Sequence, residues 1–344
     1  MTASFAPGQV PDELSSSGTL EVRDELSSSW AVGSVASGPT FGQAVVMARG
    51  RVDKVLVRRL VPHEPATPHE PATPHEPATP NDIGSGGKEF TGRTPDQVVV
   101  EEPMEIRLED TLVATTMRTP GNDFELAVGY CYTEGLLGGE AVVDVRYCAL
   151  GAASASAWNV VTVSTGGRSP EPTPRLTAGT SACGWCGSDS IDALSTRLSP
   201  LPERLDDSPD SLGGDPLDWQ IAAAVGDAVS ARQPIFDATG GSHAAAAFSL
   251  GDGTPQIIRE DVGRHNAVDK VIGRLCLDGQ LPAAGLGLWV SSRLGYEIAA
   301  KAWAAGFAAV IAVGPASSLA IETATRANLP LAGFARNGTL VRYV

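Results

Sequence analysis

The stretch GLWVSSRLGYEIAAKAWAAGFAAVIAVGPASSLAIETATRANLPLAGF, residues 287–334, decides the fold of this chain. Three short apolar runs, at 287–291, 309–313 and 331–334, have the length and composition of buried strands. The longer segments between these runs predict helices at 294–306 and 317–327. Strands and helices in alternation predict a layered α/β structure around one sheet.

Polar segments follow each of these predicted strands. They are SSR at 291–293, GPASS at 314–318 and FARNG at 334–338. Ligands of α/β sheets usually bind beyond the carboxyl ends of the strands. We therefore expect the three segments to lie on one rim of the sheet.

The same pattern extends towards the N-terminus. Apolar runs at 244–250 and 256–260, joined by the turn GDGT, predict two strands before a helix at 264–277. A helix is also expected at 219–232. Further upstream, VVVEEPMEIRLEDTLVATTMR at 98–118 alternates as two or three strands would. Asn122 and Asp123 are suited to cap a helix that reaches Leu137, and strands are expected at 142–148 and 159–164.

The N-terminal third contains little sequence that could form a core. HEPATP occurs three times at 63–80, and two prolines per six residues favour an extended chain. Its regularly spaced histidines could bind metal, but a neutral spacer is the better interpretation, because extended chain separates them by ~18 Å. The expected organisation begins with a disordered extension at 1–46, a first strand within 47–61 and a Pro-rich linker at 62–95. A domain at 96–344 follows. It is expected to contain a β-rich part at 96–180, a CxxC loop at 181–200 and an α/β part at 217–344.

Charge and composition exclude several classes of function. Asp and Glu number 40 against 25 Lys and Arg, so the net charge of −15 argues against general nucleic-acid binding. The N-terminus lacks the basic and apolar regions of a signal peptide, and no apolar stretch is long enough for a membrane helix. We therefore expect a cytoplasmic protein without a membrane anchor, in which paired cysteines are catalytic, redox-active or metal-binding.

The motif CGWCG at 183–187 is the strongest local signal of chemistry. Cys183 and Cys186 could share a metal, form a disulfide or carry sulfur, and Ser188 is expected to open a helix whose N-terminus would stabilise a thiolate. A structural zinc site needs four ligands, and a deaminase-type site needs a Glu two residues after His243, where Ala245 stands. A thioredoxin-like pair would directly follow a strand, whereas this pair follows a loop. The other cysteines are expected to be packing residues.

A second polar cluster is EDVGRHNAVDK at 260–270, between a predicted strand and a predicted helix. Arg264 and His265 at a helix start would form an anion site, and Asp269, one turn later, could orient His265. A solvated helix start is the alternative. The two hydroxyls of SSR and the guanidinium of Arg293 can bind phosphate; alternatively, Ser292 merely caps the next helix. His243 after a Gly pair is equally consistent with a presented imidazole and a buried one.

These motifs together identify the chain as similar to a known family. The order of EEPMEIRLEDTLVATTMRTPGNDFELAVGY, SACGWCG, GGSHAAAAF, EDVGRHNAVDK, SSRLGYE and GFARNG resembles that of the formate dehydrogenase accessory sulfurtransferases, FdhD, over about residues 96–343. The resemblance implies a cytidine-deaminase-like α/β sandwich with a mixed sheet but no zinc centre, and a homodimer.

The resemblance also implies an activity. Cys183 would accept persulfide sulfur from a cysteine desulfurase and pass it to the bis-molybdopterin guanine dinucleotide form of the molybdenum cofactor, for a formate dehydrogenase. Cys186 matches the second cysteine of the family motif. The cofactor-binding segment of the family falls on Phe334, Ala335, Arg336, Asn337, Gly338 and Thr339, with Thr339 where a basic residue sometimes stands. The competing hypotheses are a zinc-dependent hydrolase or deaminase on the same fold and a carrier that escorts the cofactor without moving sulfur.

Overall fold

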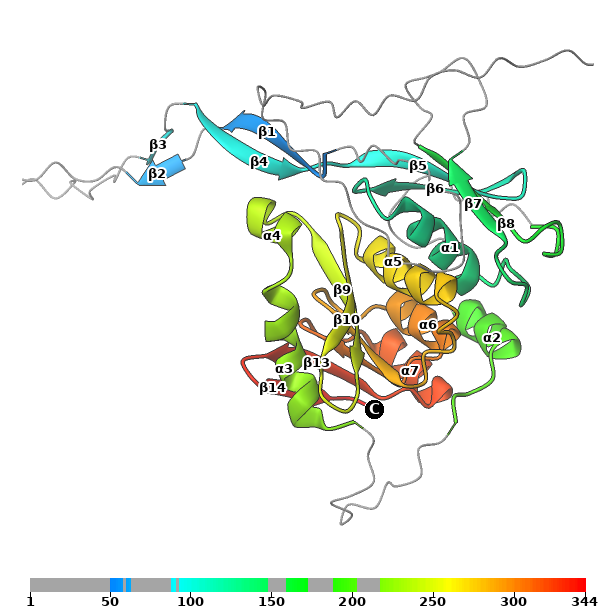
Figure 1. The fold of residues 1–344 in the computed structure, drawn as a ribbon. Helices are drawn as coiled ribbons and strands as arrows, with labels where there is room; N and C mark the ends of the chain where they lie inside the picture. The colour runs from blue at the N-terminus through cyan, green and yellow to red at the C-terminus, as the bar shows by residue number, and fades with distance from the viewer. Residues whose placement is uncertain are drawn as a thin grey trace, which may run out of the picture.

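The computed structural model describes residues 50–57, 60–62, 88–90, 93–147, 159–172, 188–202 and 217–344 (Figure 1). The strands are β1 (Val52–Val57), β2 (Leu60–Pro62), β3 (Lys88–Phe90), β4 (Thr94–Val99), β5 (Glu102–Leu108), β6 (Thr111–Arg118), β7 (Asp144–Tyr147), β8 (Val160–Ser164), β9 (His243–Ser249), β10 (Pro255–Asp261), β11 (Leu286–Val290), β12 (Ala309–Ala312), β13 (Leu331–Arg336) and β14 (Thr339–Arg342). The helices are α1 (Asp123–Thr133), α2 (Ser188–Arg197), α3 (Trp219–Ser230), α4 (Pro234–Thr239), α5 (Arg264–Leu277), α6 (Tyr296–Ala305) and α7 (Ser318–Ala327).

The main sheet has six strands in the order β10-β9-β11-β12-β13-β14. Strands β11, β12 and β13 are parallel to one another, whereas β9 runs antiparallel to both of its neighbours and β14 antiparallel to β13. The predicted fold class, a layered α/β sandwich with a mixed sheet, is confirmed.

Helices cover both faces of this sheet (Figure 1). Side chains of α5, α6 and α7 form a core on one face, and those of α3 form a core on the other. Strand β9 contributes to both cores by alternation, because Ala245 and Ala247 face the first and Ala244 and Ala246 face the second. Its run of alanines leaves room for helices close to the sheet on each side.

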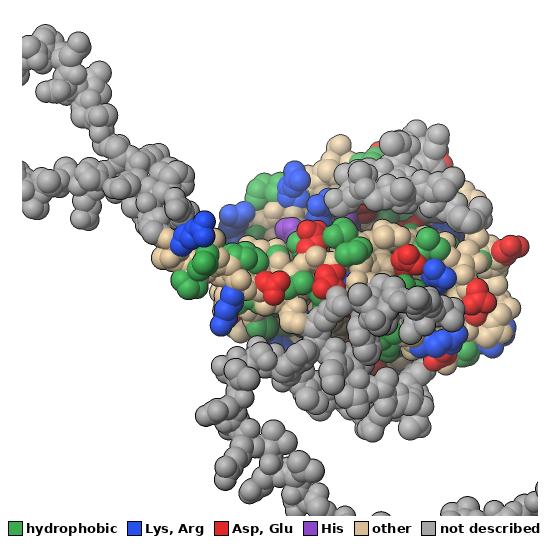
Figure 2. Space-filling model, turned by 90° about the horizontal axis from the view of Figure 1, so that it is seen from above, with side chains coloured by type: hydrophobic (Ala, Val, Ile, Leu, Met, Phe, Trp, Pro, Cys, Tyr) green, Lys and Arg blue, Asp and Glu red, His purple; other side chains and the backbone are tan. Residues whose placement is uncertain are grey.

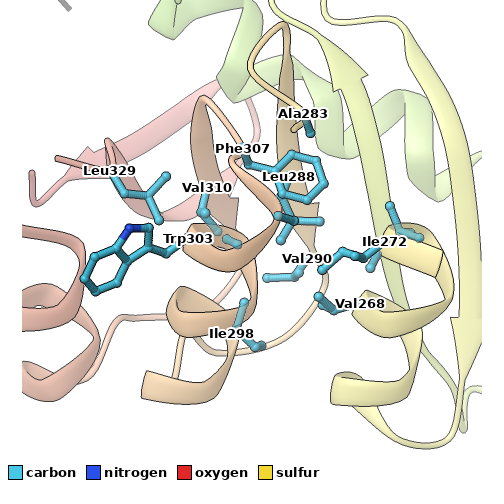
Figure 3. Packing of buried hydrophobic residues seen from close by; sticks show 14 of the residues in the cluster. Val268, Ile272, Ala283, Leu288, Val290, Ile298, Trp303, Phe307, Val310 and Leu329 are labelled. Carbon is cyan, nitrogen blue, oxygen red and sulfur yellow. The ribbon is translucent and has the colours of Figure 1, made fainter. Parts of the chain in front are cut away.

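The first core brings together aliphatic side chains from the helices and the central strands. Figure 3 shows Val268 of α5 and Ile298 of α6 near Val290 of β11, and all three side chains are at most 1% exposed. Full burial of one such side chain contributes about 1.5–3 kcal/mol. This packing holds the first turns of α5 and α6 in fixed positions at the end of the sheet.

A second, four-stranded sheet has the order β6-β5-β8-β7 and packs on one side of α1. The opposite side of α1 lies on α5, and the two helices make the most extensive contact between elements of the described chain. Helix α1 is therefore buried between the small sheet and the main layers (Figure 1).

Buried ion pairs lie on both sides of the junction between the small sheet and the main layers. The Arg118 guanidinium binds both carboxylate oxygens of Asp123 at 3.1 and 2.9 Å, and it is 1% exposed. Lys270 Nζ lies 2.6 Å from Asp261 Oδ2 and donates to Thr119 O at 2.9 Å. Such pairs are strongly destabilising when one partner is removed, because the other charge is left buried alone.

Some expected elements differ from those observed. Asn122 holds the N-cap position of α1 but has left-handed backbone angles and makes no capping bond; its Oδ1 accepts a bond from Arg51 Nη2 at 3.1 Å, and the Asp123 carboxylate binds Arg118. Helix α4 was not expected. The segment expected to contain one strand within 47–61 holds β1, which pairs with β4, and the start of β2, which pairs with β3. Strand β3 and the beginning of β4 lie within the expected linker at 62–95.

Other expectations fall on residues outside the described part of the chain. These are the disordered extension at 1–46, the HEPATP repeats and the CGWCG motif. Among the described helices, none combines the length and the apolar character needed to cross a membrane.

Candidate functional site

Five chain segments meet at one edge of the main sheet. Because β10, β11, β12 and β13 all end at this edge and β9 begins there, it collects the loops at 240–243, 261–265, 291–293, 313–317 and 336–339. We call this edge the rim. It contains each of the three strand-end segments that the sequence placed together, and also both histidines of the described residues, His243 and His265.

Hydrogen bonds connect neighbouring segments of the rim. Ala244 N donates to Ser291 Oγ at 2.9 Å, and Gly314 N donates to Ser292 O at 3.1 Å. Phe334 N donates to Gly314 O at 3.2 Å. Ser291 and Ser292 thus belong to the framework of the rim, and Ser292 does not cap the next helix, whose N-cap is Gly295.

Three arginines at the rim have no acidic partner among the described residues. Among the described residues, no carboxylate forms an ion pair with Arg264, Arg293 or Arg336, although Arg336 donates a weak 3.4 Å bond to Val313 O. Arg146 and Arg326, on other surfaces, are paired with Asp144 and Asp192. Unpaired guanidinium groups in an acidic protein are available to bind an anion.

Two helix N-termini lie at the same edge of the sheet as these arginines. Helices α5 and α6 start at the rim, their N-caps are Gly263 and Gly295, and neither end has a side-chain cap. Uncapped N-termini leave backbone N–H groups free and carry a partial positive charge. In the view from above, a histidine and several basic side chains lie near the ribbon β1–β4, with acidic side chains beside them (Figure 2).

His265 contacts Glu297, not Asp269, so the predicted His265–Asp269 pair is wrong. His265 Nε2 lies 2.5 Å from Glu297 Oε2, across the first turns of α5 and α6. Asp269 faces the interior, where it accepts bonds from Lys301 Nζ at 2.9 Å and Thr133 Oγ1 at 3.1 Å. Asp269 faces the interior because the buried ammonium of Lys301 must be paired with a carboxylate, and Asp269 provides it.

Most other polar residues of the 260–270 cluster serve the structure. Asp261 is 0% exposed and accepts bonds from Thr119 N, Gly263 N and Asn266 Nδ2. Glu260 caps α4 through Ile235 N and Phe236 N. Arg264 and His265 are therefore the members of the cluster that the rim can use.

His243 occupies the first position of β9, beside the α5 start. Burial, followed by the positive charges of Arg264 and His265, lowers the pKa of His243, and Asp261 opposes this shift. Neutral imidazole is favoured there, and neutral imidazole both donates and accepts a hydrogen bond. The sequence left the role of this residue open.

The expected cofactor segment, 334–339, comprises the end of β13, the turn at Asn337 and Gly338, and the first residue of β14. Asn337 and Gly338 have positive φ angles of 53° and 70°, as the Asn-Gly signal predicted. Phe334 also has a positive φ, 55°, and its side chain is 41% exposed. Left-handed backbone costs a non-glycine residue about 1–2 kcal/mol. The exposed ring of Phe334 therefore lies at a strained backbone position, two residues before Arg336.

Cys183 and Cys186 lie outside the described residues, and the described chain resumes at Ser188, the first residue of α2. The end of α2 is fixed by Arg197 Nη2, which donates to Thr133 O at 2.8 Å. Cys131 is fully buried on α1, as expected for a packing residue, and Cys276 is partly buried on α5. Burial raises the pKa of both thiols, that of Cys276 to about 11.

Glu297 is the rim residue that the sequence analysis did not assign. It belongs to the SSRLGYE motif, but its partner is 32 positions away along the chain (297 − 265), so no local spacing indicates the contact. Across the described ranges, no group of three or more His, Cys, Asp or Glu side chains is arranged to hold a metal ion.

The fold and the rim together define a class: a layered α/β protein with arginines and two helix N-termini gathered at the carboxyl edge of a mixed sheet. The profile of the FdhD/NarQ family matches residues 99–344, and the chain belongs to this family. It is 43% identical over 254 residues to the sulfur carrier protein FdhD of Streptomyces avermitilis, which covers 72% of this chain and 87% of that one. It is 38% identical over 270 residues to the sulfur carrier protein FdhD of Corynebacterium efficiens, covering 76% of this chain and 94% of that one.

A solved structure has the same fold. It is the crystal structure of a protein from Desulfotalea psychrophila, provisionally assigned as a formate dehydrogenase accessory protein. The superposition has a TM-score of 0.56 at 18% sequence identity and covers 84% of this chain and 96% of that one.

Proposed function

We propose that this protein is a sulfurtransferase that carries a persulfide on Cys183 and supplies sulfur to the molybdenum cofactor of a formate dehydrogenase. The main support is the name shared by its relatives, sulfur carrier protein FdhD, at about two-fifths sequence identity. A second support is the position of the CxxC motif, which ends one residue before Gly187 and two before the start of α2 at Ser188. A helix N-terminus lowers the pKa of a nearby thiol and so favours the nucleophilic thiolate.

The proposed loading step is a thiol exchange. The Cys183 thiolate attacks the outer sulfur of a persulfide on a cysteine desulfurase. A new S–S bond forms on Cys183, the donor S–S bond breaks, and the donor cysteine leaves as a thiolate with the electron pair. For delivery, the Cys186 thiolate attacks the sulfur atom of Cys183, hydrosulfide leaves with the electron pair, and a dithiol reductant later reopens the disulfide.

The acceptor would be the bis-molybdopterin guanine dinucleotide cofactor, bound as a substrate at the rim. The unpaired guanidinium groups of Arg264, Arg293 and Arg336 and the imidazole of His265 suit its phosphates. The exposed ring of Phe334, within the segment 334–339, suits stacking on a guanine base. We also propose a homodimer, a cytoplasmic location, and a cysteine desulfurase and a formate dehydrogenase as partners.

Mass spectrometry tests the sulfur step. The protein would be incubated with a cysteine desulfurase and cysteine, and then analysed as intact protein and as peptides. We expect a reducible gain of ~32 Da on Cys183 that is absent from Cys183→Ala. Cys131 and Cys276 serve as internal controls, because burial raises the pKa of both thiols. An unmodified Cys183 beside a stoichiometric bound metal would favour a zinc hydrolase instead.

A complementation assay separates a sulfurtransferase from a passive cofactor carrier. Cys183→Ala should abolish formate dehydrogenase activity in a strain that depends on this protein. Activity that survives in the variant would favour a carrier that escorts the cofactor without moving sulfur.

Nucleotide binding tests the rim. Single alanine substitutions of Arg264, His265, Arg293 and Arg336 should each weaken the binding of guanosine diphosphate in calorimetry. Arg274→Ala is the matched control, because this arginine pairs with Asp278 at the far end of α5. Unchanged affinity in all four rim variants would refute the proposed cofactor site.

A further inference from the structure

The contact between His265 and Glu297 brings a carboxylate into an otherwise cationic rim. Their side chains are 22% and 25% exposed, and they extend from the first turns of two helices whose positions the core fixes. Nε2 of His265 is enclosed, and although it lies 2.5 Å from Glu297 Oε2, the N–H is not aligned with that oxygen as in a straight hydrogen bond. Nε2 of His265 therefore faces Glu297 and is enclosed, so the contact fixes the orientation of the ring.

The surroundings of Glu297 favour its charged form. Contact with His265 is the largest influence and lowers the pKa of the Glu297 carboxyl; burial opposes this, and the positive charges of Lys301 and Arg264 add to the lowering. Lys301 lies one helical turn after Glu297 on α6 and is itself tied to Asp269 and Glu134. Glu297 is thus a carboxylate whose nearest partner is the His265 imidazole.

We infer that Glu297 is a positioning residue of the rim, which fixes the His265 ring in the orientation that binds the phosphates of the nucleotide. This inference rests on the function proposed above. Glu297 acts through His265 and does not itself touch the ligand, because a carboxylate repels phosphate. Its net effect on anion binding is favourable only while His265 is present.

The direction in which one substitution changes the affinity for guanosine diphosphate distinguishes this role from a simple charge effect. Removal of a negative charge from an anion site should strengthen phosphate binding by ordinary Coulomb attraction. If Glu297 positions His265, Glu297→Gln should instead weaken the binding of guanosine diphosphate, by about three- to tenfold. Glu297→Asp, which keeps the charge, should recover part of the loss. Glu322→Gln on the exposed side of α7 is the control and should change nothing.

A double-mutant cycle then tests whether Glu297 acts through His265. In a His265→Asn background, Glu297→Gln should leave the affinity unchanged or increase it, which reverses its effect in the wild type. A merely structural role would weaken binding equally in both backgrounds, and this result would overturn the inference. Thermal unfolding checks that each variant is folded. If Glu297→Gln is not folded, Glu297→Asp takes its place in the cycle.

The outcomes separate this inference from the function on which it rests. Wild-type protein that binds no guanosine diphosphate would overturn the nucleotide site and the role of Glu297 together. Wild-type binding with unchanged or tighter binding by Glu297→Gln would overturn the role of Glu297 alone and leave the nucleotide site standing.

Discussion

Gly129 of α1 and Gly273 of α5 lie opposite each other where the two helices cross. A Cβ atom on Gly129 would come within 1.9 Å of Asp269 O, and one on Gly273 within 1.8 Å of Glu125 O. Both obstacles are backbone atoms of the opposing helix, which cannot move without displacing it. The absence of two side chains thus lets α1 approach α5, and with it the small sheet approach the main one.

Alanine at either glycine should therefore destabilise the protein strongly. We expect Gly129→Ala or Gly273→Ala to lower the free energy of unfolding by about 3 kcal/mol, the upper end of the usual cost of overpacking. Urea denaturation would measure it. Gly251→Ala and Gly285→Ala are matched controls, since a Cβ at either position meets nothing within 4 Å. Equal stability of all four variants would show that the helices can separate at little cost.

The buried pair of Lys301 and Asp269 gives a second prediction. Burial works against the charge of Lys301, but Asp269 and Glu134 outweigh it and raise the pKa of Lys301, so the ammonium remains charged. Lys301→Met should cost about 3–5 kcal/mol in unfolding free energy, because Asp269 is left buried without its partner. The double variant Lys301→Met/Asp269→Leu should recover most of this loss. A double variant that is less stable than the single one would contradict the argument.

The sequence predicted the main layers well because their signals are local. The helix expected at 264–277 is α5, with the same limits, and the apolar run expected at 309–313 is β12 within one residue. Helix α4 was missed because it has only six residues, and the Glu260 carboxylate that stabilises its first turn comes from a distant strand. Short elements of this kind depend on tertiary contacts that a sequence window does not contain.

The sequence predicted which segments form the rim, but not which side chains pair with each other there. Strand ends and helix starts indicate which segments reach one edge, and these did bring Arg264, Arg293 and Arg336 to the rim. The spacing of His265 and Asp269 suggested a pair within one helix, yet each side chain has its partner on α6. Which of two carboxylates a histidine meets depends on how helices pack, and that information is not local.

Thiol reactivity provides a third prediction. With a pKa of about 11, only about one thousandth of Cys276 is thiolate near pH 8, and buried Cys131 should be less reactive still. Iodoacetamide should therefore modify both at least about a hundredfold more slowly in the folded protein than in urea. Peptide mass spectrometry over time would measure the rates. Rapid modification of Cys131 in the native state would mean that the core between α1 and the small sheet opens readily.

Glu109 gives the last prediction, which concerns acid stability. Burial alone would raise the pKa of its carboxyl, but hydrogen bonds from Ser164, Thr165 and Gly167 outweigh this and lower the pKa from 4.5 to about 2. Because the folded-state pKa is the lower one, the stabilisation is complete above about pH 4.5 and is lost as the pH falls towards 2. Glu109→Gln should lower the melting temperature at neutral pH, and the difference from wild type should shrink below pH 4.5. Glu140→Gln, which breaks only the exposed ion pair with Arg168, should have little effect at either pH. If the melting temperature of the Glu109 variant stays equally far below that of the wild type at low pH, the charge of Glu109 is not what stabilises the loop after β8.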